Sequence, residues 1–490
     1  MIEFVIDGKK VQGEAGETIL NVARRVGIEI PALCTDPRLP PFDSCGICVV
    51  EVEGKGVVKA CSTPISEGMV VRTRAPAAEE VRKAALELLL SAHWGDCIAA
   101  CQLNCPAHTD CQGYVGLTAN GLYLEALKLL YEKLPLPATL GRICPAPCED
   151  GCRRQIVEEP IQIRRIKRFL GDLGLDYTPP VGAPTGFRVA VVGSGPAGLS
   201  AGYFLRRMGH EVVVFEAREK LGGMLRYGIP AFRLPHEVLD REIAVLKRMG
   251  IEFRTGVALG RDLTLSELER DFHAVFLGLG AWKSRRLNVP GEDHPAVFPG
   301  IEFLARGKTG KPPELPGRVA VIGGGNTAID AARTARRLGA EAVIVYRRSR
   351  EEMPAEPEEI LEAEEEGVRF EFLAQPLEFL VDGEKLRGVR CQCTQLSEPD
   401  ASGRRRPVPI PGAEFVVPVE AAIVAVGQDP DFSFLAEMGL ALNKGGTIQA
   451  DPETGQTSRP KVFAGGDAVT GPAIAIEAIA AGHRAALAID

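Results

Sequence analysis

The feature that most constrains the fold is a repeated pattern of strand, glycine-rich turn and helix, which occurs near residues 188 and 318. The first copy reads RVAVVGSGPAGLSAGYFLRRMGHEVVVFEA and the second RVAVIGGGNTAIDAARTARRLGAEAVIVYRR. In each copy the small residues allow a tight turn, close approach of a pyrophosphate and close packing of helix on strand. The repeat therefore predicts a multidomain α/β chain with two dinucleotide-binding units built on parallel sheets.

The first unit has the features of a complete dinucleotide motif. Gly193, Gly195 and Gly198 follow the apolar strand at 188–192, and the helix after them offers N–H groups and a partial positive charge to phosphates. Glu216 ends the second strand, where a carboxylate accepts hydrogen bonds from ribose hydroxyls. These features together predict a bound dinucleotide more strongly than the glycines alone.

The second unit differs at the position that selects between nucleotides. Gly323, Gly325 and Ala328 fill the glycine positions. Arg347 and Arg348 stand where the first unit has its acid. Guanidinium groups bind a 2′-phosphate through charge-assisted hydrogen bonds, whereas a carboxylate repels it. We therefore expect NADP(H) here; the alternative is a basic loop that is only solvated.

Composition and charge exclude other classes of protein. The 490 residues exceed what one hydrophobic core supports, so three or four domains are expected. The net charge of −8 argues against a nucleic-acid partner. No apolar run reaches the ~18 residues of a membrane span. The N-terminal sequence MIEFVIDGKKVQG is typical of a strand and turn and not of a signal peptide, so a cytoplasmic location is expected.

The cysteines are concentrated at the start of the chain. Eleven of the thirteen lie before position 153, in tight groups. In a reducing compartment such groups indicate metal ligands. The alternative, a set of small buried apolar residues, would not be concentrated in this way. Cys391 and Cys393 alternate along an expected strand without a third partner, so we expect them to be structural.

The first cysteine group suits a [2Fe–2S] cluster. Its spacing, C-x10-C-x2-C-x12-C, is formed by Cys34, Cys45, Cys48 and Cys61. It differs from the plant-type ferredoxin spacing by a longer first loop. A structural zinc site is the alternative, but such sites usually pair two short C-x2-C knuckles and this group has one.

The second cysteine group is nearly large enough for two [4Fe–4S] clusters. Its members form two runs with steps of four, with one further cysteine between the runs: Cys97, Cys101, Cys105, Cys111, Cys144, Cys148 and Cys152. Bacterial ferredoxins assign the cysteine before a proline to the other cluster of the pair. The basic residues at 164–168 are expected to be the solvated face of a helix, with an acidic docking partner as the alternative.

Several longer segments resemble the glutamate synthase small subunit and its relatives. They are GGMLRYGIPAFRLP (222–235), VIGGGNTAIDAAR (321–333), VYRRSREEMPA (345–355), VAVGQDPDF (424–432) and VFAGGDAVTGPAIAIEAIAAGHRAA (462–486). The resemblance covers about residues 90–490. The relatives include the N-terminal part of dihydropyrimidine dehydrogenase and the large subunit of transhydrogenases that reduce ferredoxin with NADPH. It implies FAD in the first unit, NADPH in the second, and a return of the chain after about 420 to the FAD domain.

The resemblance also implies which residues contact the cofactors. Asp467 would bind the ribityl or phosphate region of FAD, and a helix starting near Pro472 would direct its N-terminus at the flavin ring. The remaining implied FAD contacts are Gly223, Arg226, Gly280 and Gly466. The implied NADPH contacts, besides the motif residues, are Asn326 and Thr327.

A second resemblance concerns the clusters. GETILNVARRVGIEIPALC is similar to the N-terminal domain of the complex I large iron–sulfur subunit and of iron hydrogenases. In the glutamate synthase pattern, Cys105 joins Cys144, Cys148 and Cys152 in one cluster. The other cluster would keep Cys97 and Cys101. His93 stands where that pattern has its first cysteine, and Cys111 is the candidate fourth ligand; the alternatives are a helix cap for His93 and a buried bystander for Cys111.

These expectations define five segments. They are a β-grasp ferredoxin-like [2Fe–2S] domain (1–75), a helical domain with two [4Fe–4S] clusters (76–180), the first part of the FAD domain (187–300), the NAD(P)H domain (301–420) and the second part of the FAD domain (421–490). The Pro- and Gly-rich segment 175–186 is expected to be a linker.

The expected function is electron transfer between NADPH, FAD and the clusters, without catalytic acid–base residues. The chain would be the NAD(P)H-reactive subunit of a hetero-oligomer, with other redox subunits or ferredoxin as partners. A genuine glutamate synthase small subunit and a non-catalytic metal-binding scaffold are the alternatives.

Overall fold

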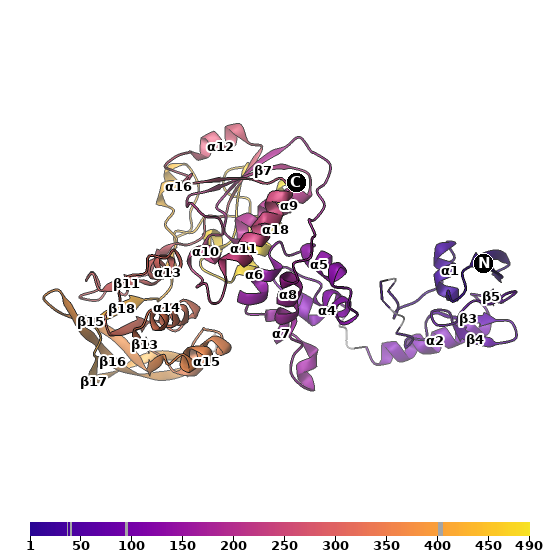
Figure 1. Cartoon of the computed structure of the whole chain (residues 1–490), viewed down its shortest axis with the longest axis horizontal. Helices are drawn as coiled ribbons and strands as arrows, with labels where there is room; N and C mark the ends of the chain where they lie inside the picture. Colours follow the sequence, from indigo (N-terminus) through magenta and orange to yellow (C-terminus); the bar gives the residue numbers. More distant parts are fainter. Residues whose placement is uncertain (37, 40–41, 94–96, 400–404) are drawn as a thin grey trace. The chain divides into compact units, whose positions relative to one another are not determined.

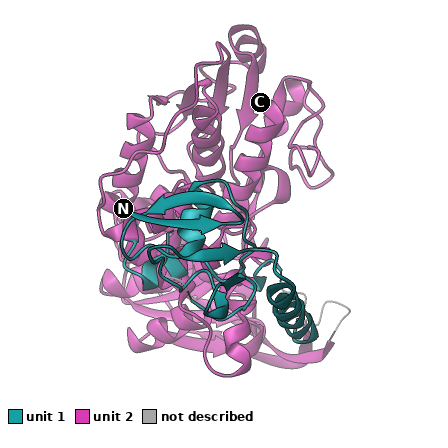
Figure 2. Cartoon of the chain, turned by 90° about the vertical axis from the view of Figure 1, so that its right-hand side faces the viewer, with its two compact units in different colours: residues 1–100, 116–122 teal, residues 101–115, 123–490 magenta. Residues whose placement is uncertain are grey.

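The computed structural model describes residues 1–36, 38–39, 42–93, 97–399 and 405–490. The chain divides into two compact units, which Figure 2 shows in different colours. Unit 1 comprises Met1–Ala100 and Gly116–Leu122, and unit 2 comprises Cys101–Val115 and Tyr123–Asp490. Among the described residues, no helix combines the length and apolar character needed to cross a bilayer.

Unit 1 contains a five-stranded sheet in the order β2-β1-β5-β3-β4. Its strands are β1 (Ile2–Ile6), β2 (Lys9–Gly13), β3 (Val49–Val52), β4 (Gly56–Lys59) and β5 (Val70–Arg72). Asp7 and Gly8 both have positive φ, as the two-residue turn between β1 and β2 requires. Thr18 caps α1 (Ile19–Arg25) by accepting the N–H of Asn21.

Helix α2 (Pro76–Ser91) is fastened to this sheet by one arginine. Arg82 donates to the carbonyl oxygens of Ile47 at 3.0 Å and Val49 at 2.7 Å. Five short helices follow: α3 (Ala100–Leu103), α4 (Cys111–Ala119), α5 (Tyr123–Tyr131), α6 (Pro137–Ile143) and α7 (Pro147–Asp150). A 3₁₀ turn, η1 (Arg153–Ile156), then leads to α8 (Ile163–Asp172) (Figure 1).

The first sheet of unit 2 is fully parallel, with the order β20-β9-β6-β7-β8. Its strands are β6 (Arg188–Val192), β7 (Glu211–Glu216), β8 (Glu252–Thr255), β9 (Ala274–Leu277) and β20 (Val462–Ala464). Helices α9 (Pro196–Arg207), α11 (His236–Arg248) and α18 (Ala475–Ile489) cover one face. Helices α12 (Leu265–Asp271) and α16 (Ser433–Glu437) cover the other. The implied return of the chain to this sheet is confirmed by β20, which pairs with β9.

The segment expected to be a linker is packed against this sheet's core instead. Leu175, Tyr177 and Val181 contact the apolar cluster that also contains residues of α5 and α6. The N–H of Gly182 donates to the carbonyl oxygen of Arg207 at 2.8 Å. The linker expectation was wrong because apolar residues within the Pro- and Gly-rich stretch bury on α9 and its surroundings.

The second sheet is also parallel, with the order β11-β18-β12-β13-β14. Its strands are β11 (Val297–Pro299), β12 (Arg318–Ile322), β13 (Glu341–Tyr346), β14 (Arg369–Phe372) and β18 (Ala421–Val424). Helices α13 (Gly300–Lys308), α14 (Asn326–Arg337) and α15 (Pro357–Glu365) pack on one face. Both β11 and β18 lie just outside the expected segment 301–420, because these short apolar strands pair with each other and β18 with β12.

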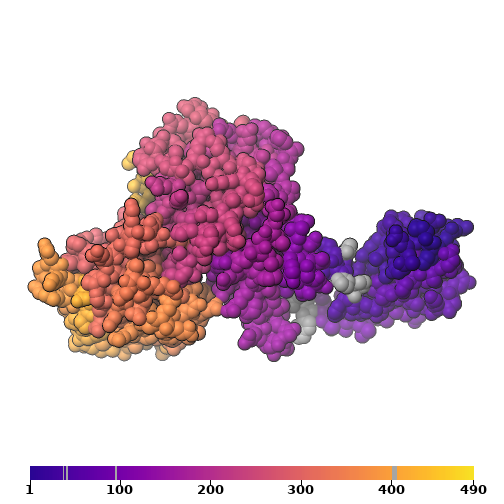
Figure 3. Space-filling model, viewed as in Figure 1, coloured from indigo at the N-terminus to yellow at the C-terminus, as the bar shows by residue number. Residues whose placement is uncertain are grey.

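An antiparallel sheet covers the opposite face of the second sheet. It consists of β15 (Ala374–Asp382), β16 (Lys385–Pro399) and β17 (Arg405–Val417), and Cys391 lies in its buried core. In Figure 3 this sheet, in orange, lies at an outer edge of unit 2. A two-stranded ladder of β10 (Lys283–Ser284) and β19 (Gln428–Asp429) lies where the chain passes from the first sheet to the second and back.

Candidate cofactor cavity and cysteine sites

Unit 2 contains a cavity of about 540 Å³ at the carboxyl ends of the first sheet's strands. Its wall includes residues that end or follow β6, β7, β9 and β20, where open α/β sheets bind their ligands. Asn326 and Thr327, which begin α14 in the second dinucleotide motif, also line this cavity. So do Ile143 and Pro145, the two neighbours of Cys144. One cavity is therefore lined by residues of both dinucleotide motifs and by the two residues that flank Cys144.

The first glycine-rich loop cannot carry side chains at two of its positions. Gly193 has φ +100°, and a Cβ there would lie 2.3 Å from the carbonyl oxygen of Gly278. A Cβ on Gly198 would lie 1.9 Å from the carbonyl oxygen of Gly193. Gly195 precedes α9 as its N-cap without a side-chain hydrogen bond, so the N–H groups of the first turn are free for an anion. This loop fits the pyrophosphate of a dinucleotide.

Glu216 lies at the cavity wall, and its contact with a ribose stays a prediction. Its carboxylate accepts the backbone N–H of Ser194 at 3.0 Å and that of Arg218 at 2.9 Å. The hydroxyl of Ser194 also donates to Glu216 and accepts the N–H of Gly222 at 3.0 Å. Ser194 therefore holds the acid in place beside the loop, a role that the spacing of the motif did not reveal.

Asp467 and the start of α18 also line the cavity. Burial raises the pKa of Asp467 to about 6, although a hydrogen bond from the N–H of Ala473 acts to lower it. Gly466 is the N-cap of α17 (Asp467–Thr470). Helix α18 begins at Ala475, slightly later than the resemblance implied, and Pro472, Ala473 and Ala475 all line the cavity.

Arg226 does not reach the cavity that Gly223 and Gly280 line. Its guanidinium donates to the carbonyl oxygen of Leu221 at 3.0 Å and pairs with Asp240. Its guanidinium is held by Asp240 of α11, and the contact of Arg226 with the cofactor stays a prediction. Arg218 and Trp282, which stack with a distance of 4.1 Å from the guanidinium to the ring centroid, line the cavity and were not foreseen.

In the second dinucleotide motif, the three arginines that follow β13 differ from one another in their surroundings. Arg348 donates through Nε to the carbonyl oxygen of Arg405 at 3.0 Å, and Arg350 pairs with Glu364. The side chain of Arg347 is exposed and makes no hydrogen bond or ion pair with the part of the chain that the structure describes. Of the three, Arg347 has the guanidinium that is most available to a phosphate.

In the second dinucleotide motif, the first glycine is sterically required. A Cβ on Gly323 would lie 2.3 Å from the carbonyl oxygen of Ala425. Gly325 is the N-cap of α14, again without a side-chain hydrogen bond. Asn326 accepts the N–H of Glu356 at 3.0 Å. This loop offers a second anion site at a helix N-terminus, suited to the pyrophosphate of NADP(H).

The first four cysteines lie together in unit 1. The N–H of Cys45 donates to the sulfur of Cys34 at 3.5 Å, and the thiols of Cys48 and Cys61 interact with each other. Burial acts to raise the pKa of Cys34, but hydrogen bonds from Cys45 and Ser44 outweigh it and lower that pKa to about 7. Backbone N–H groups directed at sulfur stabilise thiolates, so this loop fits a cluster held by cysteines.

The second cysteine group is mostly buried in unit 2. The thiol of Cys111 interacts with those of Cys101 and Cys148, and Cys105 and Cys144 lie near enough to influence each other. The sulfur of Cys144 accepts the N–H of Ala146 at 3.4 Å. Cys152 is buried at the start of η1.

His93 and Cys97 belong to unit 1, where the imidazole Nε2 lies 3.3 Å from the sulfur. Among the residues that the structure describes, no three His, Cys, Asp or Glu side chains surround one point as a single metal ion would require.

Three family models match the chain. Residues 187–482 match pyridine nucleotide-disulphide oxidoreductase, and residues 1–76 match a 2Fe-2S iron-sulfur cluster binding domain. Residues 93–178 match dihydropyrimidine dehydrogenase domain II, described as a 4Fe-4S cluster domain. The chain thus combines a dinucleotide-binding oxidoreductase region with both types of iron–sulfur domain, and the expected FAD, NADP(H), [2Fe–2S] and [4Fe–4S] cofactors are supported.

The solved structures agree on the fold. FprA, an oxidoreductase of Mycobacterium tuberculosis, aligns with a TM-score of 0.55 and 21% identity over 63% of this chain and 84% of its own.

Relatives by sequence are closer. The NADP(+)-dependent formate dehydrogenase subunit beta of Moorella thermoacetica is 42% identical over 80% of this chain, which spans 59% of that relative's length. The NADPH-Fe(3+) oxidoreductase subunit beta of Geobacter sulfurreducens is 40% identical over 80% of this chain and 63% of its own. The glutamate synthase [NADPH] small chain of Escherichia coli is 39% identical over 79% of this chain and 87% of its own. The chain therefore belongs to the pyridine nucleotide-disulphide oxidoreductase family and, within it, to the group that includes the glutamate synthase small chains.

Proposed function

We propose that this chain transfers electrons from NADPH through FAD to iron–sulfur clusters, as the NAD(P)H-reactive subunit of a larger cytoplasmic redox complex. The observation that carries the proposal is the single cavity lined by both dinucleotide motifs and by the residues on either side of Cys144. When bound, FAD accepts a hydride and releases single electrons, which clusters carry one at a time.

The residues have defined tasks in this proposal. The N-termini of α9 and α14 bind the two pyrophosphates, Glu216 binds an FAD ribose, and Asp467 binds the ribityl or phosphate region. Arg347 binds the 2′-phosphate of NADP(H), with Arg348 beside it.

The cluster assignments follow the sequence predictions. Cys34, Cys45, Cys48 and Cys61 would hold the [2Fe–2S] cluster. Cys105, Cys144, Cys148 and Cys152 would hold one [4Fe–4S] cluster. The set His93, Cys97, Cys101 and Cys111 remains a prediction for the second one.

The partners are proposed to be other redox subunits or ferredoxin. The names of the formate dehydrogenase and Fe(3+) oxidoreductase relatives describe them as beta subunits, which supports an assembly of different chains. A glutamate synthase small chain is the second candidate, because this chain spans 87% of the Escherichia coli relative. Glutamine-dependent oxidation of NADPH in the presence of a large partner chain would favour that candidate.

The direct test is anaerobic titration of the full chain with NADPH. We expect stoichiometric flavin, bleaching of its absorbance by NADPH, and subsequent electron paramagnetic resonance signals of reduced clusters. A Cys61→Ser variant provides a control, because it should lose the [2Fe–2S] signal and retain flavin reduction. The proposal would be contradicted if the protein contained no flavin or no iron, or if NADPH did not reduce its flavin.

A further inference from the structure

Helix α6 joins the flavin cavity to a cysteine of the second group. Its last residue, Ile143, lines the cavity, Cys144 follows directly as the C-cap, and Pro145 lines the cavity again. The position of this short backbone stretch therefore sets where the Cys144 sulfur lies relative to the cavity. Whatever fixes α6 along its axis also fixes that relation.

The N-terminus of α6 is capped by a residue from another element. Leu136, its N-cap residue, provides no side-chain hydrogen bond. Instead, Glu242 of α11 accepts the N–H of Ala138 at 2.6 Å through Oε1 and the N–H of Thr139 at 2.9 Å through Oε2. All three residues are buried. A carboxylate at this end satisfies two N–H groups that lack helical partners and complements the helix dipole.

Contacts along the side of α6 restrict its other movements. A Cβ on Gly141 would lie 2.4 Å from the Cα of Arg168, and one on Gly171 would lie 2.6 Å from the Cα of Ala138. Helices α6 and α8 therefore touch backbone to backbone at two points. These contacts oppose rotation and separation, while the carboxylate of Glu242 holds the end of α6 against α11.

We propose that Glu242 is a positioning residue for electron transfer: through α6 it holds Cys144 and its neighbours in register with the flavin cavity. This rests on the proposed function. It extends that function by naming a residue that touches neither cofactor nor cysteine. Helix α11 follows segment 222–235, which contributes Gly223 and Met224 to the cavity, so the link runs from the cavity's own wall to the cysteine.

The test compares two isosteric substitutions. In Glu242→Gln the side chain keeps one acceptor oxygen but presents an NH₂ group to the other N–H, so one of the two bonds is lost. Glu292→Gln is the matched control: Glu292 is also buried and accepts two backbone N–H groups, from Leu287 at 2.8 Å and Asn288 at 2.7 Å, but does not contact α6.

Rapid mixing with NADPH separates the two half-reactions. For Glu242→Gln we expect wild-type flavin and iron content, an unchanged rate of flavin reduction, a rate of cluster reduction lowered by about tenfold, and an altered electron paramagnetic resonance spectrum of the cluster. Glu292→Gln should match the wild type in both rates. If Glu242→Gln reduces its clusters at the wild-type rate with an unchanged spectrum, Glu242 is only structural and the proposal is wrong.

A second variant covers the possibility that Glu242→Gln does not fold. Glu242→Asp keeps the carboxyl group but shortens the side chain by one methylene. The same selective slowing of cluster reduction is therefore expected, and a wild-type rate would overturn the proposal. Flavin that NADPH fails to reduce in the wild type would instead refute the proposed function itself. The two failures are therefore distinguishable.

Discussion

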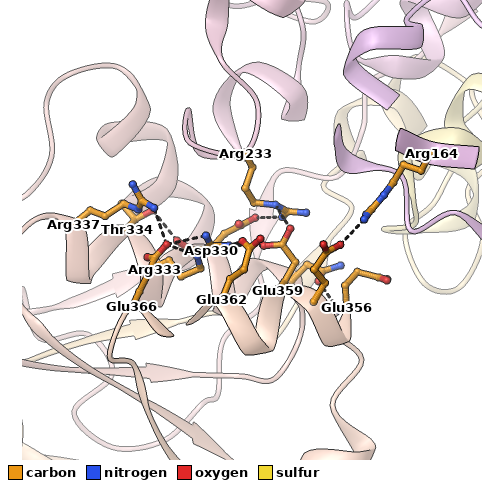
Figure 4. Close-up of polar contacts among 12 residues, drawn as sticks. Arg164, Arg233, Asp330, Arg333, Thr334, Arg337, Glu356, Glu359, Glu362 and Glu366 are labelled. Carbon is orange, nitrogen blue, oxygen red and sulfur yellow. Dashed lines mark hydrogen bonds and ion pairs between the residues drawn. The ribbon is translucent and has the colours of Figure 1, made fainter. Parts of the chain in front are cut away.

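Replacing Arg233 should separate the electrostatic role of a buried arginine from its packing role. Arg233 lies just before α11 and reaches α14 and α15 of the NAD(P)H domain. Its Nη1 lies 2.8 Å from Asp330 Oδ2, and its Nε lies 2.8 Å from Glu359 Oε1 (Figure 4). Glu359 has a further partner in Arg333, at 2.6 Å. The guanidinium of Arg333 also lies over the ring of Phe232, the residue before Arg233, at 4.7 Å from the ring centroid.

The expected magnitude follows from which carboxylate is left unpaired. In Arg233→Met, Glu359 keeps its ion pair with Arg333, whereas Asp330, which is 4% exposed, loses its only ion-pair partner among the described residues. Removing one member of a buried pair typically costs about 3–5 kcal/mol, because the remaining charge stays desolvated. Methionine retains much of the apolar stem, so most of this loss is electrostatic.

The assay is anaerobic urea unfolding of the holoprotein, followed by flavin fluorescence. Arg233→Met should lower the free energy of the transition that releases flavin by about 3 kcal/mol or more. Adding Asp330→Asn should recover about 2 kcal/mol, because the unpaired charge is then absent. A double variant as unstable as Arg233→Met alone, or a single variant within about 0.5 kcal/mol of the wild type, would refute this account of the pair.

Three further predictions concern single positions. In steady-state assays, Arg347→Ala should raise the KM for NADPH about tenfold and leave the KM for NADH unchanged. Arg350→Ala is the control and should change neither KM, because the Arg350 guanidinium already pairs with Glu364. Equal effects of Arg347→Ala on both nucleotides would contradict the 2′-phosphate assignment. Gly198→Ala should yield protein without flavin, measured by absorbance after purification, because its Cβ would overlap the carbonyl oxygen of Gly193; full flavin content would contradict this. Burial raises the pKa of Asp330 to about 6 from its ordinary 3.8. Its protonated form therefore contributes stability that is fully present below pH 3.8 and is lost as the pH rises through 6. The free energy of unfolding changes by about 3 kcal/mol over this range. Asp330→Asn should therefore flatten the fall in stability with rising pH over this range, as measured by urea midpoints, and an unchanged slope would contradict the assignment.

The parts of the fold that could be predicted depend on contacts close in sequence. The turn at Asp7 and Gly8, the cap at Thr18 and the two glycine-rich loops all involve neighbours within a few residues, so their residue types are sufficient evidence. The parts that were missed depend on distant contacts. The packing of Tyr177 against the first core and the pairing of β18 with β11 cannot be read from local pattern, because the apolar surfaces involved come from far along the chain.

The same distinction between local and distant contacts explains which residues of the candidate site could be predicted. Glu216 was predictable because its position is fixed by spacing within one motif, whereas the environment of Arg226 was not, since Asp240 on α11 determines where the guanidinium goes. In the sequence, Glu242 looks like any acid on the polar face of an amphipathic helix. Its function becomes apparent only when the structure shows a buried carboxylate bonded to a helix 104 residues away in the chain.

Buried charges are the features of this chain that most clearly connect its cofactor regions. Desolvating a carboxylate or guanidinium is costly unless a specific partner offsets it, so such a group constrains the geometry of whatever it bonds. Glu242 joins the first dinucleotide unit to the helix before Cys144, and Arg233 joins the same unit to α14 and α15. Glu242 lies on α11 and Arg233 lies three residues before this helix begins. The stretch 233–248 therefore fixes both the nucleotide-binding unit and the cysteine helix relative to the cavity. Electron transfer through this chain should consequently be more sensitive to substitutions in this stretch than to equally buried substitutions elsewhere in unit 2.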